Sequence, residues 1–330
     1  GAPTVELEDD LYAASADALL ERLRRVPDTV ASIMLIGHNP GMHELALMLA
    51  GSGDAAAKKS LEDNLPTAGL AILGFLGEAH KLSSEERRTV VATFVRCAEG
   101  RRPVWVGVRA LGLAGAIEQA REAQELGATA VFAAPLDGAS DAMQFEYYAT
   151  LAKSVAIPVI IHDFPDSFGT EIKAEVVAKL GREGGVGMIK MEEPPVGQKI
   201  TRIRELAGDS MRIFGGLGGV YLLEELQRGA VGTMTGFAYP EILAAIYERF
   251  AAGDEAGAAA VYDKYCPLIR YEFQPKIGLA LRKYIYMRRG AIACNAIRSP
   301  GMRIDDITTR ELESVVQRVG LAIDAPPLRF

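Results

Sequence analysis

Short apolar runs rich in β-branched residues recur along the chain from residue 102 onward, and longer segments of helical period separate them. The runs begin at Arg102, Ala128, Ile157, Val186, Met211 and Val231. Intervals of 20 to 29 residues between these starts accommodate one strand and one crossover helix each time. Strands that are apolar on both faces and joined by helices predict a parallel sheet covered by helices.

A further apolar run at 69–75, GLAILGF, extends this repeat to about seven βα units. A repeat of that length favours an α/β (β/α)8 barrel over an open sheet. Residues 32–37, SIMLIG, are predicted to supply the eighth strand, and the helix that begins at Pro40 is its crossover. Only helices are expected after residue 253. The predicted organisation is therefore an α-β-α segment at 1–68, βα units at 69–253 and a helical layer at 254–330.

Charge and cysteine content narrow the classes of partner. The 43 acidic side chains exceed the 36 of Lys and Arg, and no block of five like charges occurs. Nucleic acid and anionic membranes are therefore not expected as partners, whereas a small molecule is. Three distant cysteines, Cys97, Cys266 and Cys294, argue against a disulfide framework or a CxxC metal site. We expect no metal or cofactor, and a reducing, cytoplasmic location.

Lys190 lies near the end of the apolar run VGMIKM at 186–191. In a parallel barrel this position is at the carboxyl-end face, where barrels of this kind carry their sites. Burial disfavours the ammonium form, and a desolvated amine is a nucleophile that forms a Schiff base with a ketone. The alternative interpretation is a lysine that reaches the surface at the strand end and pairs with Glu192 or Glu193.

His162 stands at the end of another run, IPVIIHDF, and has an ordinary pKa near neutrality. It is a candidate general acid and base, and the alternative is a half-buried histidine bound to a loop. Asp163 is not expected to touch the ring, because neighbours in a strand point to opposite faces. Glu78 is interpreted as a structural residue that holds its loop or caps the next helix. The turn GGLGG at 215–219 follows a strand and offers N–H groups, so Gly215 is assigned to a substrate-pocket loop.

Several segments resemble, in order and spacing, the dihydrodipicolinate synthase and N-acetylneuraminate lyase family of Schiff-base lyases and aldolases. They are GFLGEAHKLSSEERR, RPVWVGV, VFAAP, IPVIIHDFP and GMIKMEE, followed by the helical tail. The resemblance covers about 69–330. It implies a barrel whose sixth strand carries a lysine that forms an imine with pyruvate or a related 2-oxo acid, and Lys190 falls on that position. Gly232 matches a position whose backbone lines the pyruvate pocket, and family members commonly form homo-oligomers.

The sequence departs from this family at three motifs. The family's Gly-Thr-Thr-Gly-Glu segment reads GFLGE at 74–78. Its two hydroxyls are absent, and the substrate carboxylate is expected to bind backbone N–H groups at Phe75, Leu76 and Gly77. The family's catalytic Tyr is replaced by His162, and its Pro-Tyr-Tyr segment reads PLD at 135–137.

The amino-terminal segment, about 1–74, resembles the carboxyl-terminal part of SixA-type phosphohistidine phosphatases. IGHNPGMHELALMLAG and LPTAGLAILGF carry this resemblance, and His38 matches the second active-site histidine. No Arg-His-Gly segment is present for the nucleophile, so phosphatase activity is not expected. We hypothesise a chimera in which a phosphatase-like βα unit replaces the first unit of the barrel. The hypothesis requires 32–37 to pair beside 70–74.

Two functions therefore follow from the sequence. The favoured one is a lysine Schiff-base lyase or aldolase that acts on pyruvate or another 2-oxo acid, with Lys190 as nucleophile and His162 as the proton carrier. The alternative is a catalytically silent chimeric barrel. Loss of the Thr pair and the Tyr residues favours the alternative, and retention of Lys190 in its strand opposes it.

Overall fold

The structure is a computed structural model that describes residues 15–25, 71–73 and 78–330. The chain divides into two compact units, 1–66 and 67–330. The described part of the first unit contains helix α1 (Ala16–Arg24), within the α-β-α segment predicted at 1–68. The Ser15 hydroxyl accepts a hydrogen bond from the Ala18 N–H and so caps an otherwise unpaired helix donor.

Among the described residues of the second unit, six parallel strands form one sheet, and neighbours in the sheet follow the chain order β1-β2-β3-β4-β5-β6. The strands are β1 (Ala71–Leu73), β2 (Val104–Val108), β3 (Ala130–Ala133), β4 (Val159–Asp163), β5 (Met188–Met191) and β6 (Arg212–Phe214). The predicted parallel α/β sheet is confirmed. The strand expected from Val231 is reduced to a single parallel bridge between Gly215 and Thr233.

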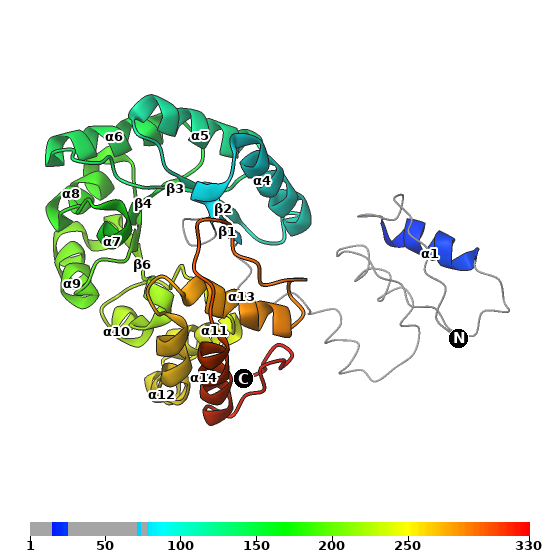
Figure 1. Cartoon of the computed structure of the whole chain (residues 1–330). Coiled ribbons are helices and arrows are strands. Elements are labelled where there is room, and N and C mark those ends of the chain that lie inside the picture. The colour runs from blue at the N-terminus through cyan, green and yellow to red at the C-terminus, as the bar shows by residue number, and fades with distance from the viewer. Residues whose placement is uncertain (1–14, 26–70, 74–77) are drawn as a thin grey trace, which may run out of the picture. The chain divides into compact units, whose positions relative to one another are not determined.

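Helices follow the strands and cover the outer side of the sheet, and Figure 1 shows them in an arc around the strands. They are α4 (Ser84–Ala98), α5 (Leu113–Glu125), α6 (Asp141–Lys153), α8 (Ala174–Lys179), α9 (Val196–Ala207) and α10 (Leu222–Gln227). Local sequence sets their starts. Helix α4, for example, begins at a capping box in which Ser83 and Glu86 each bind the other's backbone N–H.

Shorter helical turns complete this part of the chain. They are η3 (Ala79–Lys81), α7 (Pro165–Phe168), η4 (Leu180–Gly184), η5 (Gly208–Ser210) and η6 (Leu217–Gly219). The last of these turns carries part of the candidate site.

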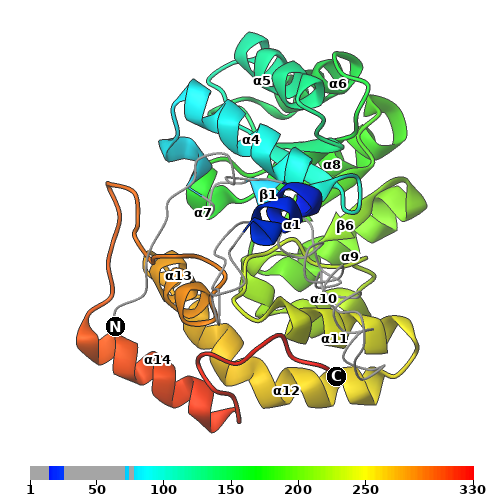
Figure 2. The ribbon, with the colours of Figure 1, turned by 90° about the vertical axis from the view of Figure 1, so that its right-hand side faces the viewer.

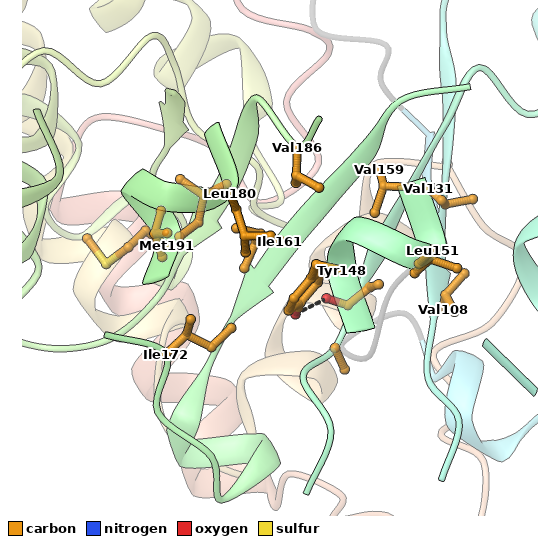
Figure 3. Close-up of a cluster of buried hydrophobic side chains, with 14 of the residues drawn as sticks. Val108, Val131, Tyr148, Leu151, Val159, Ile161, Ile172, Leu180, Val186 and Met191 are labelled. Atoms are coloured by element: carbon orange, nitrogen blue, oxygen red, sulfur yellow. Dashed lines mark hydrogen bonds between the residues drawn. The ribbon is translucent and has the colours of Figure 1, made fainter. Parts of the chain in front are cut away.

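Alternation along strands β2 to β6 separates two apolar clusters. On β4, Val159 and Ile161 pack in the large cluster between the sheet and the helices, which Figure 3 shows together with the hydrogen bond from the Tyr148 hydroxyl to the Ala133 carbonyl. Ile160 belongs to a smaller cluster with Phe132. Because successive side chains point to opposite faces, His162 lies on the same face as Ile160.

Four helices from residue 240 onward form a second layer with its own buried cluster, and Figure 2 shows them grouped at one end of this unit, away from α5 and α6. They are α11 (Pro240–Ala251), α12 (Glu255–Glu272), α13 (Gly278–Arg288) and α14 (Asp306–Arg318). The buried Glu272 at the end of α12 accepts hydrogen bonds from the Ala238 N–H and from Nε of Arg282. The segment EFQP, which begins at Glu272, thus joins α12 to α13 and to the chain before α11.

The expected strand at 32–37, the helix from Pro40 and His38 lie outside the described residues, as does the pairing required beside 70–74. The phosphatase-like unit and the chimera therefore stay predictions. Within the described ranges, no helix is long and apolar enough to span a membrane.

Candidate active site

Lys190 lies on β5 directly opposite His162 of β4, and the two residues are Cα partners in the parallel register. The side chain is buried, with the residue 6% exposed. Its Nζ atom lies 2.5 Å from Oε2 of Glu192 and 3.2 Å from Nε2 of His162. The lysine is thus both buried and paired, and its partner is Glu192 rather than Glu193.

Glu192 follows Lys190 by two residues, so both side chains project from the same face of the chain. Its carboxylate is buried and accepts a hydrogen bond from the Leu217 N–H, while Oε2 lies 3.0 Å from Nε2 of His162. Burial alone would raise the pKa of Glu192. The charge of Lys190 and the hydrogen bonds from His162 and Lys190 outweigh burial and lower this pKa to about 2, so the group is a carboxylate at neutral pH.

His162 is 3% exposed and contacts three aromatic rings. The centroids of Phe132, Phe168 and Phe164 lie 5.2, 4.9 and 6.2 Å from that of the imidazole. Burial, together with the charge of Lys190, lowers the pKa of His162 to about 4 despite the opposing effect of Glu192. The ring is therefore neutral at pH 7. Its Nε2 donates to Glu192 in one tautomer and accepts from Lys190 in the other.

Asp163 lies on the other face of β4, as the alternation of the strand predicts. Its Oδ2 lies 2.7 Å from Nζ of Lys199, which also binds Glu193. Burial raises the pKa of Asp163 to about 6, against the opposing charge of Lys199. Asp163 and Glu193 therefore hold the outer side of the strand rather than the candidate site.

The turn at 215–219 supplies backbone donors at the carboxyl end of β6. The Gly215 N–H donates to the Gly232 carbonyl at 2.9 Å, so the structure brings these two assigned glycines together. Leu217 has φ of 48°, a left-handed conformation that is uncommon for a residue with a Cβ, and its N–H is aimed at Glu192. The anion bound by this turn is thus the protein's own carboxylate. Phe75, Leu76 and Gly77 lie outside the described residues.

Glu78 anchors the start of the segment that precedes α4. Its carboxylate accepts hydrogen bonds from Nζ of Lys81, Nζ of Lys283 and the N–H of Arg298. Lys283 and Arg298 come from distant parts of the chain, and these contacts agree with a residue that holds its loop.

A cavity of about 630 Å³ opens at the carboxyl ends of β2, β3 and β4. Phe132, His162, Phe168 and Arg109 are among its lining residues, and the guanidinium of Arg109 lies 5.0 Å from the centre of the Phe168 ring. The cavity reaches His162, whose Nε2 contacts Lys190. In the ranges 15–25, 71–73 and 78–330, no three His, Cys, Asp or Glu side chains are grouped to hold a metal ion.

The sequence indicates Glu192 only as a possible ion-pair partner of Lys190. Its spacing of two residues from Lys190 is the sequence feature that indicates a place beside Lys190, because that spacing places both side chains on one face of a strand. Its contacts with His162 and Leu217 depend on residues 30 and 25 positions away. No local pattern indicates those contacts.

Together, the fold and the site define a class: parallel α/β proteins with a buried lysine at the carboxyl end of a strand, paired with a carboxylate. A family model matches residues 59–319, and the chain belongs to the dihydrodipicolinate synthetase family, whose members are lyases and aldolases built on a TIM barrel.

Three similar proteins illustrate this family. The L-2-keto-3-deoxyarabonate dehydratase of Azospirillum brasilense is 31% identical over 82% of this chain and 90% of its own length. A probable 2-dehydro-3-deoxy-D-pentonate aldolase of Escherichia coli is 30% identical over 71% of this chain and 85% of its own. The crystal structure of dihydrodipicolinate synthase from Rhodopseudomonas palustris is 32% identical, covers 75% of this chain and 85% of that one, and has a TM-score of 0.70.

Proposed function

We propose that this protein is a Schiff-base-forming lyase or aldolase that acts on a 2-oxo acid through Lys190. The observation that carries the proposal is the buried Lys190 amine, 2.5 Å from the Glu192 carboxylate at the carboxyl end of the sheet. A desolvated amine next to a proton acceptor is the arrangement that nucleophilic catalysis by lysine requires. Membership of a family of lyases and aldolases supports the same chemistry.

The first steps need a proton acceptor beside Lys190. Glu192 takes a proton from the ammonium, and the free amine attacks the ketone carbon of the substrate. The carbonyl oxygen leaves as water and a C=N bond replaces C=O. The resulting imine draws electrons from the neighbouring carbon, and His162 and Glu192 exchange the proton that moves while the substrate is cleaved, joined or dehydrated.

The substrate class follows from the relatives and the size of the cavity. Two relatives of at least 30% identity are named for 2-oxo acids that are deoxygenated at carbon 3. The 630 Å³ cavity next to His162 has room for a chain longer than that of pyruvate. We assign the backbone at Phe75, Leu76 and Gly77 to binding of the substrate's carboxyl end. Gly215 and Gly232, whose backbones are hydrogen-bonded to each other, are assigned to the lining of the substrate pocket.

The proposal is tested by intact mass after incubation with borohydride and either pyruvate or a panel of larger 2-oxo acids. The parent protein is expected to gain one reduced adduct, and Lys190→Ala is expected to gain none. Lys173→Ala, which changes an exposed lysine paired with Asp141, is the matched control and retains the adduct. Absence of an adduct from the parent with every 2-oxo acid would instead support the catalytically silent barrel.

A further inference from the structure

A second buried carboxyl group, Glu225 of α10, lies on the opposite side of the turn that holds Glu192. Glu225 is 0% exposed, and neither of its carboxyl oxygens forms a hydrogen bond of normal geometry within the described part of the chain. A buried carboxylate without a partner is costly, because desolvation penalises the charged form strongly. A buried carboxyl group at this position therefore calls for a structural or functional explanation.

Two adjacent glycines separate the two carboxyl groups. A Cβ on Gly215 would lie 1.7 Å from Oε2 of Glu225, and a Cβ on Gly216 would lie 2.3 Å from Cγ of Glu192. A side chain at either position would therefore force a carboxyl group to move, because one carboxyl group lies against the turn at each glycine. The same turn donates the Leu217 N–H to Glu192.

No cation neutralises Glu225 among the described residues around it. The titratable groups that act on it from the neighbouring elements are Glu192 after β5, Glu224 on its own helix and Tyr262 of α12. Lys190 is in contact with Glu192, on the other side of the turn. A charge on Glu225 would therefore repel that of Glu192 and would be uncompensated.

We propose that Glu225 is a positioning residue of the active site: buried and uncharged behind the Gly215–Gly216 turn, it leaves the site's single negative charge on Glu192, and a charge on Glu225 impairs imine formation. The inference rests on the proposed function of Lys190. A charge on Glu225 would repel the Glu192 carboxylate across the turn whose Leu217 N–H holds it, and would so displace the proton acceptor from its place beside Lys190.

The pKa of Glu225 agrees with this geometry. Burial raises it to about 8, the charge of Glu192 adds to the rise, and the nearby N–H of Gly216 offsets only part of it. The unfolded chain has the ordinary carboxyl pKa, so the folded protein binds more protons than the unfolded chain between these two values. The contribution of Glu225 to the free energy of unfolding is therefore fully present below the ordinary carboxyl pKa, and it is lost as the pH rises toward about 8.

The first test is independent of activity. The difference in thermal midpoint, Glu225→Gln minus parent, is expected to rise between about pH 5 and about pH 8. The parent loses stability over this range as Glu225 ionises, whereas the glutamine of the variant has no proton to lose, so the variant does not. Glu225→Met is a second uncharged variant. Poor packing of either side chain would lower its thermal midpoint equally at every pH, so both variants should show the same rise with pH. Glu224→Gln changes the exposed neighbour on the same helix and should show a difference that is constant with pH. A constant difference for both Glu225 variants would overturn the proposal.

The second test measures the rate of the borohydride-trapped adduct with pyruvate. The ratio of the rate at about pH 9 to that at about pH 6.5 is expected to be about tenfold higher in Glu225→Gln than in the parent, which corresponds to about 1.4 kcal/mol in the barrier. An equal ratio in the two proteins contradicts the proposal. If the parent forms no adduct at any pH, the proposed function fails, and the thermal midpoints still decide the protonation state of Glu225.

Discussion

At the residue scale, the site consists of one cation, one anion and one neutral ring. Lys190, Glu192 and His162 are each less than a tenth exposed, and the contacts among them range from 2.5 to 3.2 Å. The sequence indicated Lys190 and His162, because each polar residue interrupts an apolar strand. The roles of Glu192 and Glu225 could not be predicted, because they depend on contacts between strands and across a turn.

His162→Ala separates imine formation from turnover. Loss of one well-placed proton carrier is expected to slow turnover by roughly a hundred- to ten-thousandfold, whereas the Lys190 amine and Glu192 remain to form the imine. Steady-state turnover with a substrate identified from the panel and the trapped-adduct yield measure the two steps. Unchanged turnover would exclude His162 from proton transfer.

Glu192→Gln removes the proton acceptor beside Lys190 and retains its shape. We expect turnover to fall by about a hundredfold or more, the usual effect of losing a general base. Glu193→Gln is the matched control, because Glu193 binds Lys199 on the other side of the strand. If both variants lost the same activity, the effect would come from charge in general rather than from the position of Glu192.

At the element scale, regular βα spacing located β2 to β6, because strands covered on both faces are continuous apolar runs. The run from Val231 is the exception. Gly232 has φ of 150°, outside the range of an ordinary strand, and the pairing there is limited to the Thr233 bridge. The helical layer after residue 253 was also predicted. The role of EFQP could be recognised only from the structure, because it depends on the contacts of Glu272 with Ala238 and Arg282.

Glu272→Ala tests how α12 and α13 are held together. The substitution leaves the buried Arg282 guanidinium without its carboxylate, and breaking a buried pair in this way costs about 3–5 kcal/mol. Glu313→Ala removes the partly exposed partner of Arg288 and is expected to cost less than about 1 kcal/mol. Urea unfolding of both variants measures the difference, and equal losses would show that the Glu272 pair is not a major contact.

At the scale of the whole molecule, the parallel sheet brings the ends of separate strands to one edge, where the site and the cavity both lie. The sequence predicted this edge through the βα order, and the resemblance supplied the expected chemistry. The acidic balance of 43 to 36 agrees with a small-molecule partner. The amino-terminal replacement of a barrel unit stays a prediction, since 32–37 lies outside the described residues.

The most direct measurement is a peptide map of the protein after trapping with pyruvate and borohydride. The account predicts that the reduced adduct is on Lys190 alone, because its amine is desolvated and lies beside Glu192. Lys199, also largely buried but bound to Asp163 and Glu193, is the internal control and should be unmodified. An adduct on Lys199 or spread over surface lysines, or no adduct at all, would contradict the central claim.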